Sequence, residues 1–389
     1  MKKGIATFTL DFGKCPAWLF NRMVRLSREM TKVLVEEYGP DEFVKRIADP
    51  VWFQSLGTVL AFDWNASGLT TVLTGALKEA IKGQEKNLGI FIAGGKGKTS
   101  LKTPDQITSW GKFLNLSEFT TKTLVRNSKM SAKVDSSLVQ DGYQLYHHAF
   151  FFSDPKKGNG AWAVVQQGMN TKNKTARRYH WFDTLTNSSR NFVNEPHLGI
   201  ASQKKEEIVL NLVASDSSKT RDVSTELIQG GYKQLNSDIK LLQKHQNEMS
   251  KMLRFKHGDD VCTLLKLEKE DFYHHSIESE DFSKSKYLDK MLKKLDEIKP
   301  KTYEELVETK GVGPKTVRAL SLVSEVIYGA EPSYKDPARY SFAHGGKDTI
   351  PFPVDRKTYD STIEILSNAV RKTKITPFEK DRILRRITR

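Results

Sequence analysis

The stretch Lys301–Tyr328, KTYEELVETKGVGPKTVRALSLVSEVIY, decides the fold that we expect for the second half of the chain. Thr302 has the side chain of a helix N-cap, and Glu305 follows at the spacing of a capping box. We therefore expect a short helix over Tyr303–Thr309, with Leu306 and Val307 buried.

The second part of the stretch predicts a tight turn and a second helix. Gly311 and Gly313 interrupt helical structure and permit the turn, and Pro314 suits the first position of a new helix. That helix is expected to run to about Tyr328, because apolar residues recur every three or four positions: Val317, Leu320, Val323 and Ile327.

A turn of this kind leaves backbone N–H groups at the start of the second helix without intrahelical partners. Together with the positive end of the helix dipole, they favour a phosphate group. Such contacts hold a nucleic-acid backbone without distinguishing the bases. The residues expected to make them are Gly311, Val312, Gly313 and Thr316.

Three ordered segments resemble the helix-hairpin-helix DNA glycosylase superfamily. They are EDFSKSKYLDKMLKKL at 280–295, GVGPKT at 311–316 and IPFPVDRKTY at 350–359. The last segment is similar to the turn that carries the catalytic aspartate in archaeal 8-oxoguanine glycosylases. The whole chain also resembles a prokaryotic family of unknown function, number 763, which implies no particular chemistry.

The resemblance implies that Lys315 is the nucleophile of a base-excision reaction. In the resembling enzymes, a lysine here attacks the sugar C1′, displaces the damaged base and forms a Schiff base that permits β-elimination. The amine must be neutral to react. The alternative is that Lys315 only contacts DNA phosphate.

The same resemblance makes Asp355 the carboxylate that stabilises positive charge on the sugar or deprotonates the lysine. Its separation from Lys315 is wider than in most of these enzymes, and Asp336 is the rival position. We favour Asp355 because Pro337 biases Asp336 towards an extended or turn conformation. Either aspartate could instead be a plain helix cap.

The segment 329–350, GAEPSYKDPARYSFAHGGKDTI, has the composition of a base-pocket wall. Tyr340 and Phe342 could enclose an extruded base, while His344 or Lys347 could hydrogen-bond to its edge. A structural loop with two buried aromatic residues is the equal alternative.

Residues 1–217 are expected to form an α+β domain with antiparallel strands, and residues 218–389 an all-α domain with the helix-hairpin-helix. Strands are predicted at 143–153 and 161–168, where the adjacent His147 and His148 must face opposite sides. The basic stretch 171–181 suggests DNA-backbone contacts by Arg177 and Arg178, or a basic loop with buried aromatic residues. A predicted helix at 118–138 carries four basic residues near one face, either solvated or facing DNA: Lys122, Arg126, Lys129 and Lys133.

The composition points to a soluble protein with a polyanionic partner. The 389-residue chain has a net charge of +15. Its two cysteines cannot build a disulfide framework, a four-cysteine zinc site or a cysteine-ligated iron–sulfur cluster. No apolar run is long enough to span a bilayer, and the N-terminus lacks the apolar core of a signal peptide. We expect a cytoplasmic, nucleoid-associated monomer.

These observations predict a DNA glycosylase with AP lyase activity that acts on damaged double-stranded DNA. No metal or cofactor is required, although the resemblance allows a monovalent cation at the hairpin. One alternative is a non-catalytic helix-hairpin-helix DNA-binding protein. Another is a nuclease with its site in the N-terminal domain, where acids are scattered without metal-ligand spacing: Asp63, Asp154 and Asp183.

Overall fold

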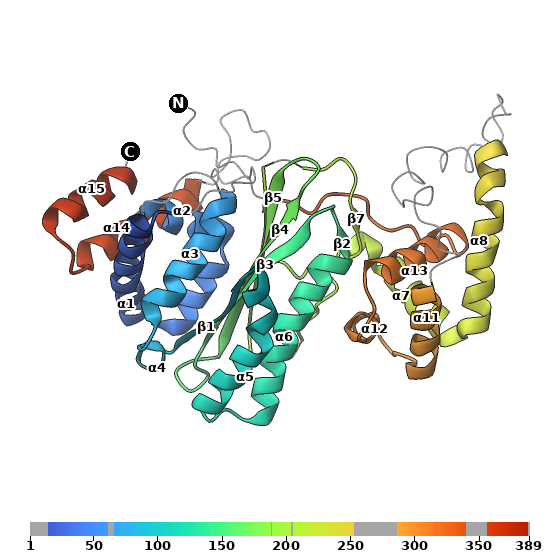
Figure 1. The fold of residues 1–389 in the computed structure, drawn as a ribbon, viewed down its shortest axis with the longest axis horizontal. Coiled ribbons are helices and arrows are strands. Elements are labelled where there is room, and N and C mark those ends of the chain that lie inside the picture. Colours follow the sequence, from blue (N-terminus) through green and yellow to red (C-terminus); the bar gives the residue numbers. More distant parts are fainter. Residues whose placement is uncertain are drawn as a thin grey trace.

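The computed structural model describes residues 15–60, 66–187, 189–203, 205–252, 286–339 and 356–387. Within these ranges the centre of the molecule is a five-stranded antiparallel sheet of strand order β1-β3-β4-β5-β6. Helices cover both of its faces (Figure 1). The strands are β1 (Ile90–Lys96), β3 (Gln144–Ser153), β4 (Ala161–Asn170), β5 (Thr175–Thr184) and β6 (Gly199–Ser202).

The sequence of β3 explains why the sheet is buried on both faces. Phe150 and Phe152 belong to one hydrophobic core, and Phe151 between them belongs to the other. Successive side chains of a strand point to opposite faces, so an uninterrupted aromatic run supplies both cores. A strand with one solvated face would instead alternate apolar and polar residues.

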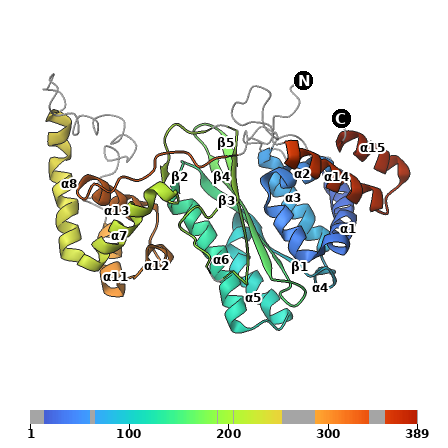
Figure 2. The ribbon, with the colours of Figure 1, turned by 180° about the vertical axis from the view of Figure 1, so that it is seen from behind.

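Helices from both ends of the chain cover one face of the sheet. They are α1 (Ala17–Ala48), α2 (Pro50–Val59), α3 (Ala66–Ile81), α4 (Glu85–Leu88), α14 (Arg356–Lys372) and α15 (Pro377–Ile387). Their inward side chains join those of β1, β3 and β4 in a single core. Both views show α14 and α15 beside α1 and α2, at the opposite end of the molecule from α13 (Figures 1 and 2).

Two helices cover the other face of the sheet. Five further described helices form a unit whose apolar side chains belong to the same hydrophobic core. The two helices are α5 (Thr103–Phe113), preceded by the 3-10 helix η1 (Gly97–Lys102), and α6 (Glu118–Ser137). The helical unit contains α7 (Ser218–Gly230), α8 (Tyr232–Met252), α11 (Lys286–Ile298), α12 (Tyr303–Glu308) and α13 (Pro314–Val326). A small sheet pairs β2 (Val139–Gln140), which follows α6, with β7 (Leu210–Asn211). The 3-10 helix η2 (Ser215–Ser217) then leads from β7 into α7.

The adjacent histidines of β3 face opposite layers, as predicted. His147 Nε2 lies 3.2 Å from the hydroxyl of Thr74 on α3, and His148 Nε2 lies 2.8 Å from that of Ser128 on α6. Both imidazoles are buried, and burial lowers both pKa values, that of His147 to about 3. They are neutral interior residues that hold different helices to the sheet.

The structure confirms a mixed α/β chain with an antiparallel sheet in the N-terminal half and helices towards the C-terminus. The boundary expected near residue 217 coincides with the start of α7. Among the described helices beyond it, α14 and α15 pack with the N-terminal helices α1 and α2. None of the helices in the described ranges is long and apolar enough to cross a membrane.

Candidate functional site

The stretch around Gly311 forms two helices joined by the α12–α13 turn, Thr309–Pro314. The Thr302 hydroxyl accepts a hydrogen bond from Glu305 N at 3.2 Å, and the Glu305 carboxylate accepts one from Lys301 N at 2.7 Å. Gly311 has φ of 102°, a conformation that strains other residues, and Pro314 begins α13. The sequence therefore predicted the helices, their cap and the break between them.

Side-chain donors from elsewhere in the chain occupy the carbonyl groups of the α12–α13 turn. Lys133 Nζ of α6 donates to Thr309 O at 2.6 Å, and Lys294 Nζ of α11 donates to Lys310 O at 2.7 Å. The Tyr287 hydroxyl donates to Gly311 O at 2.6 Å, and Gln140 Nε2 donates to Pro314 O at 3.1 Å. Four carbonyls at the surface of the turn are thus satisfied by residues that the sequence did not single out for this role.

The backbone N–H groups at the start of α13, in contrast to these carbonyls, lack hydrogen-bond partners within the described ranges. Among the described residues, the amides of Gly313, Lys315 and Thr316 have no backbone acceptor, as expected for a first helical turn. The buried hydroxyl of Thr316 has no hydrogen-bond partner either. Since the carbonyls are satisfied and the donors are not, the polar groups that remain suit an anion.

Lys315 stands at this position with its side chain exposed. No hydrogen bond or ion pair joins its amine to another residue in the described part of the chain. A methyl group built on Gly313 would meet no atom within 4 Å, so the turn is open towards solvent there. An incoming anion can therefore approach both the amides and the amine.

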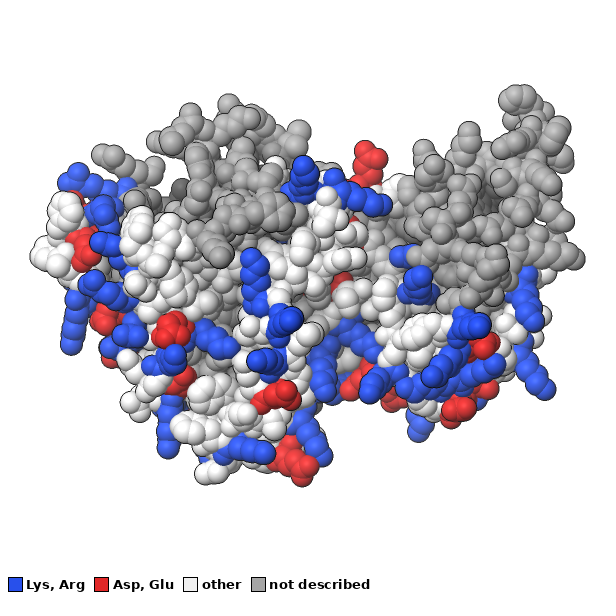
Figure 3. Space-filling model, in the orientation of Figure 1, with Lys and Arg blue, Asp and Glu red and all other residues white. Residues whose placement is uncertain are grey.

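Basic side chains gather around the turn. Figure 3 shows Lys and Arg over α6 and over the region of α11 and α12. Five exposed lysines on α6, α11, the turn and the start of α13 form no ion pair within the described ranges: Lys129, Lys286, Lys290, Lys310 and Lys315. Exposed lysines thus surround the turn, interspersed with exposed acidic residues of the α11–α12 region, among them Glu297, Glu305 and Glu308.

The basic face of α6 serves partly to dock α12. Arg126 forms ion pairs with Glu304 at 2.8 Å and with Glu308 at 2.7 Å. Burial is the main reason that the pKa of Lys133 falls to about 8, with Glu308 opposing the shift and Lys294 adding to it. Two of the four basic residues expected to be solvated or to face DNA are therefore contacts between helices.

The carbonyl contacts also bear on the monovalent cation that was expected at the hairpin. Four side chains donate to the carbonyl oxygens of the turn, and two of these donors are the ammonium groups of Lys133 and Lys294. A metal cation would have to share these oxygens with positive charges already bound to them. The arrangement favours an anion at the turn rather than a cation.

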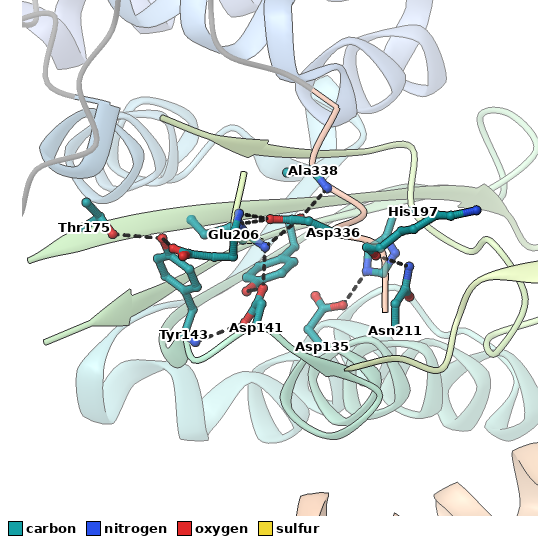
Figure 4. Close-up of polar contacts among 12 residues, drawn as sticks. Asp135, Asp141, Tyr143, Thr175, His197, Glu206, Asn211, Asp336 and Ala338 are labelled. Atoms are coloured by element: carbon teal, nitrogen blue, oxygen red, sulfur yellow. Dashed lines mark hydrogen bonds and ion pairs between the residues drawn. The ribbon is translucent and has the colours of Figure 1, made fainter. Parts of the chain in front are cut away.

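Arg177 is not at the surface, contrary to its predicted contact with DNA phosphate. Its side chain is fully buried and bonds to Asp141 at 3.0 Å and to Asp336 at 2.7 Å. Figure 4 shows these two carboxylates close together. Asp336 also accepts hydrogen bonds from the backbone of Glu206 and Ala338. Burial disfavours the charged guanidinium, but the two carboxylates outweigh it and raise the pKa of Arg177. Asp336, the rival catalytic aspartate, is therefore enclosed in an ion pair and not exposed beside Lys315.

Arg178 is also fully buried, so it cannot make the phosphate contact expected of it. It points to the opposite face of the sheet, where it donates to Thr70 at 3.1 Å and to Gln54 at 3.4 Å. Its guanidinium lies 4.5 Å from the ring centre of Phe53. Burial lowers the pKa of Arg178 well below its ordinary value. The two arginines of the basic stretch lie in the interior strand β5 because each finds partners in a different layer, whereas Lys172 and Lys174 are exposed in the turn before it.

The other predicted site residues lie outside the described residues. They are Asp355, Tyr340, Phe342, His344 and Lys347. α14 begins at Arg356 and packs against α1 and α2, while α13 lies at the other end of the molecule (Figure 1). Among the described residues, no carboxylate forms an ion pair with Lys315.

A buried cluster around Asp135 was not anticipated from the sequence. Its carboxylate accepts hydrogen bonds from Trp181 Nε1 at 2.9 Å, Gln166 Nε2 at 2.5 Å and His197 Nε2 at 2.5 Å. His197 also lies edge-on to Trp181, with ring centres 4.6 Å apart. The cluster joins α6 to β4, β5 and the loop that follows β5.

The scattered acids considered for a nuclease have structural contacts or are not described. Asp154 accepts a hydrogen bond from Lys156 N at 3.0 Å, and Asp183 pairs with Arg190 at 2.9 Å. Asp63 lies outside the described residues. Within the part of the chain that the structure covers, no group of three or more His, Cys, Asp or Glu could hold a metal ion.

Comparison with known proteins gives a family but no activity. No curated protein and no solved structure matches this chain. A family model described as "Protein of unknown function (DUF763)" matches residues 4–354. Because that match spans most of the sequence, the chain belongs to the DUF763 family.

Proposed function

We propose that this protein binds the phosphate backbone of DNA at the α12–α13 turn. The proposal depends on which polar groups of the turn have partners. Side chains donate to its carbonyl groups, whereas the amides of Gly313, Lys315 and Thr316 have no backbone acceptor among the described residues. Amides at a helix N-terminus, next to a free lysine, are suited to a phosphate group.

The charge of the chain supports the same function. A net charge of +15 attracts polyanions, and the lysines around the turn would give a DNA backbone several further contacts. The resemblance of GVGPKT to helix-hairpin-helix proteins agrees with this function. Because phosphate contacts carry no sequence information, we expect binding that is steeply salt-dependent and little affected by base sequence.

Fluorescence anisotropy with a labelled duplex tests the proposal. Lys315→Ala should weaken binding and reduce the salt slope by about one. Gly313→Ala should also weaken binding, because its methyl group would project into the open approach to the amides. Lys82→Ala, which removes an exposed lysine directly after α3 on the other side of the sheet, is the control. Equal effects of all three variants, or no binding by the wild type, would refute the proposal.

A glycosylase–lyase reaction at the same turn is the second candidate. The exposed, unpaired amine of Lys315 favours it, since a Schiff-base nucleophile must be accessible. The test is borohydride trapping on DNA that contains an abasic site, in the presence of a metal chelator. A covalent adduct that disappears in Lys315→Ala supports the reaction. The absence of an adduct from a protein that still binds the duplex leaves a binding function alone.

A further inference from the structure

The aromatic ring of Tyr287 lies beside the α12–α13 turn and is held there. Its hydroxyl donates to Gly311 O at 2.6 Å, and the residue is 54% exposed although its hydroxyl is bonded. The side chain is thus fixed at its tip while much of its surface remains open to solvent. An exposed aromatic ring that is already ordered loses little entropy when a flat ligand stacks on it.

The hydroxyl of Tyr287 binds the chain just before the amides proposed to hold a phosphate. Only two residue steps separate Gly311, whose carbonyl Tyr287 binds, from Gly313, where the unpaired amides begin. Two steps along the chain span at most about 7.6 Å between Cα atoms. An anion site and an aromatic residue bonded to the same turn suit the two ends of one nucleotide, its phosphate and its base.

We propose that Tyr287 and the α12–α13 turn together bind a nucleotide whose base is unpaired, so that the protein prefers single-stranded DNA to the same sequence in a duplex. This inference rests on the proposed function and specifies its substrate class. In a duplex, neighbouring base pairs cover both faces of each base. Extruding a base costs at least as much as one aromatic stack returns. The tyrosine therefore selects bases that are already exposed.

The ratio of affinities for the single strand and the duplex tests this inference. A labelled oligonucleotide, alone and annealed to its complement, is titrated by fluorescence anisotropy at one salt concentration. Tyr287→Ala should lower the preference for the single strand by about tenfold, the scale of one base–aromatic stack. Tyr287→Phe should retain the preference, because it keeps the ring and removes only the hydroxyl. Tyr328→Ala is the matched control, since Tyr328 is 43% exposed and its hydroxyl also has a partner, Asp238.

The outcomes separate this inference from the proposed function. If Tyr287 only fixed the Gly311 carbonyl, then Tyr287→Phe and Tyr287→Ala would weaken both forms of DNA alike, and the inference would be wrong. If Lys315→Ala and Gly313→Ala weaken binding but Tyr287→Ala leaves the ratio unchanged, the phosphate site stands and the stacking role fails. If the wild type binds neither form, both fail.

Discussion

Arg177 and Asp336 form a two-point ion pair in the interior, with N–O distances of 3.0 and 2.7 Å, although 159 residues separate them. The pair ties β5 to the segment that follows α13. That segment also pairs with the sheets, since Arg339 N donates to Ile200 O and Asn211 N donates to Ser333 O. A basic residue expected at the surface and a candidate catalytic acid thus hold each other inside the protein.

Asp336→Asn should destabilise the protein by about 3 kcal/mol, because it removes one charge of a buried pair. Asp216→Asn is the control: Asp216 pairs with Lys335 on the same segment, but both side chains are largely exposed. Its loss should cost less than about 1 kcal/mol. Urea unfolding of both variants measures the difference, and similar midpoints for the two would show that the interior pair contributes little.

The features that the sequence predicted are those with local causes. The cap at Thr302, the glycine break and the proline at the start of α13 each depend on neighbouring residues, and so does the alternation of His147 and His148 across β3. Such local signals predict a strand, a helix or a turn without knowledge of the tertiary contacts.

The features that the sequence could not predict depend on distant partners. Arg177 is buried because Asp141, 36 residues earlier, and Asp336, 159 residues later, neutralise it. Lys133 bonds to a carbonyl 176 residues away. A cluster of basic residues in the sequence does not show which distant carboxylates will pair with them. For that reason the sequence predicted phosphate contacts for Arg177, which lies in an interior strand.

The two glycines of the α12–α13 turn should differ in their tolerance of alanine. At Gly311, φ is 102° and an added Cβ would lie 2.7 Å from Met291 Sδ, so we expect a loss of roughly 1–3 kcal/mol. At Gly313 the backbone is extended and the space is open, so the loss should stay below about 1 kcal/mol. Thermal unfolding of both variants tests this ranking, and the opposite order would contradict the geometry of the turn.

Asp135→Asn should destabilise the protein, because an amide presents an N–H group to a site that receives three donors: Trp181, Gln166 and His197. Leaving a buried donor unsatisfied costs roughly 1–3 kcal/mol. The control is Asp222→Asn, an exposed aspartate of α7, which should change stability by less than about 0.5 kcal/mol. Near-ultraviolet circular dichroism should also change in Asp135→Asn alone, because the Trp181 indole would then donate to a neutral amide oxygen in place of a carboxylate.

Lys133 should make the stability of the protein depend on pH in the alkaline range. Burial lowers its pKa from 10.5 to about 8 in the folded state. Between about pH 8 and 10.5 the folded protein therefore binds fewer protons at this site than the unfolded chain. The free energy of unfolding contributed by Lys133 should rise with pH across that window and stay at its lowest value below it.

The measurement compares urea unfolding of the wild type and Lys133→Met from neutral pH to about pH 10. The difference in unfolding free energy between the two should shift in favour of the wild type as pH rises, because the cost of burying the ammonium group disappears while the contact with Thr309 O can persist through the neutral amine. Lys129→Met removes an exposed lysine from the same helix, and subtracting its curve isolates the contribution of Lys133. A difference that is constant with pH, or that favours the wild type most at neutral pH, would mean that burial does not destabilise the Lys133 ammonium in the folded protein.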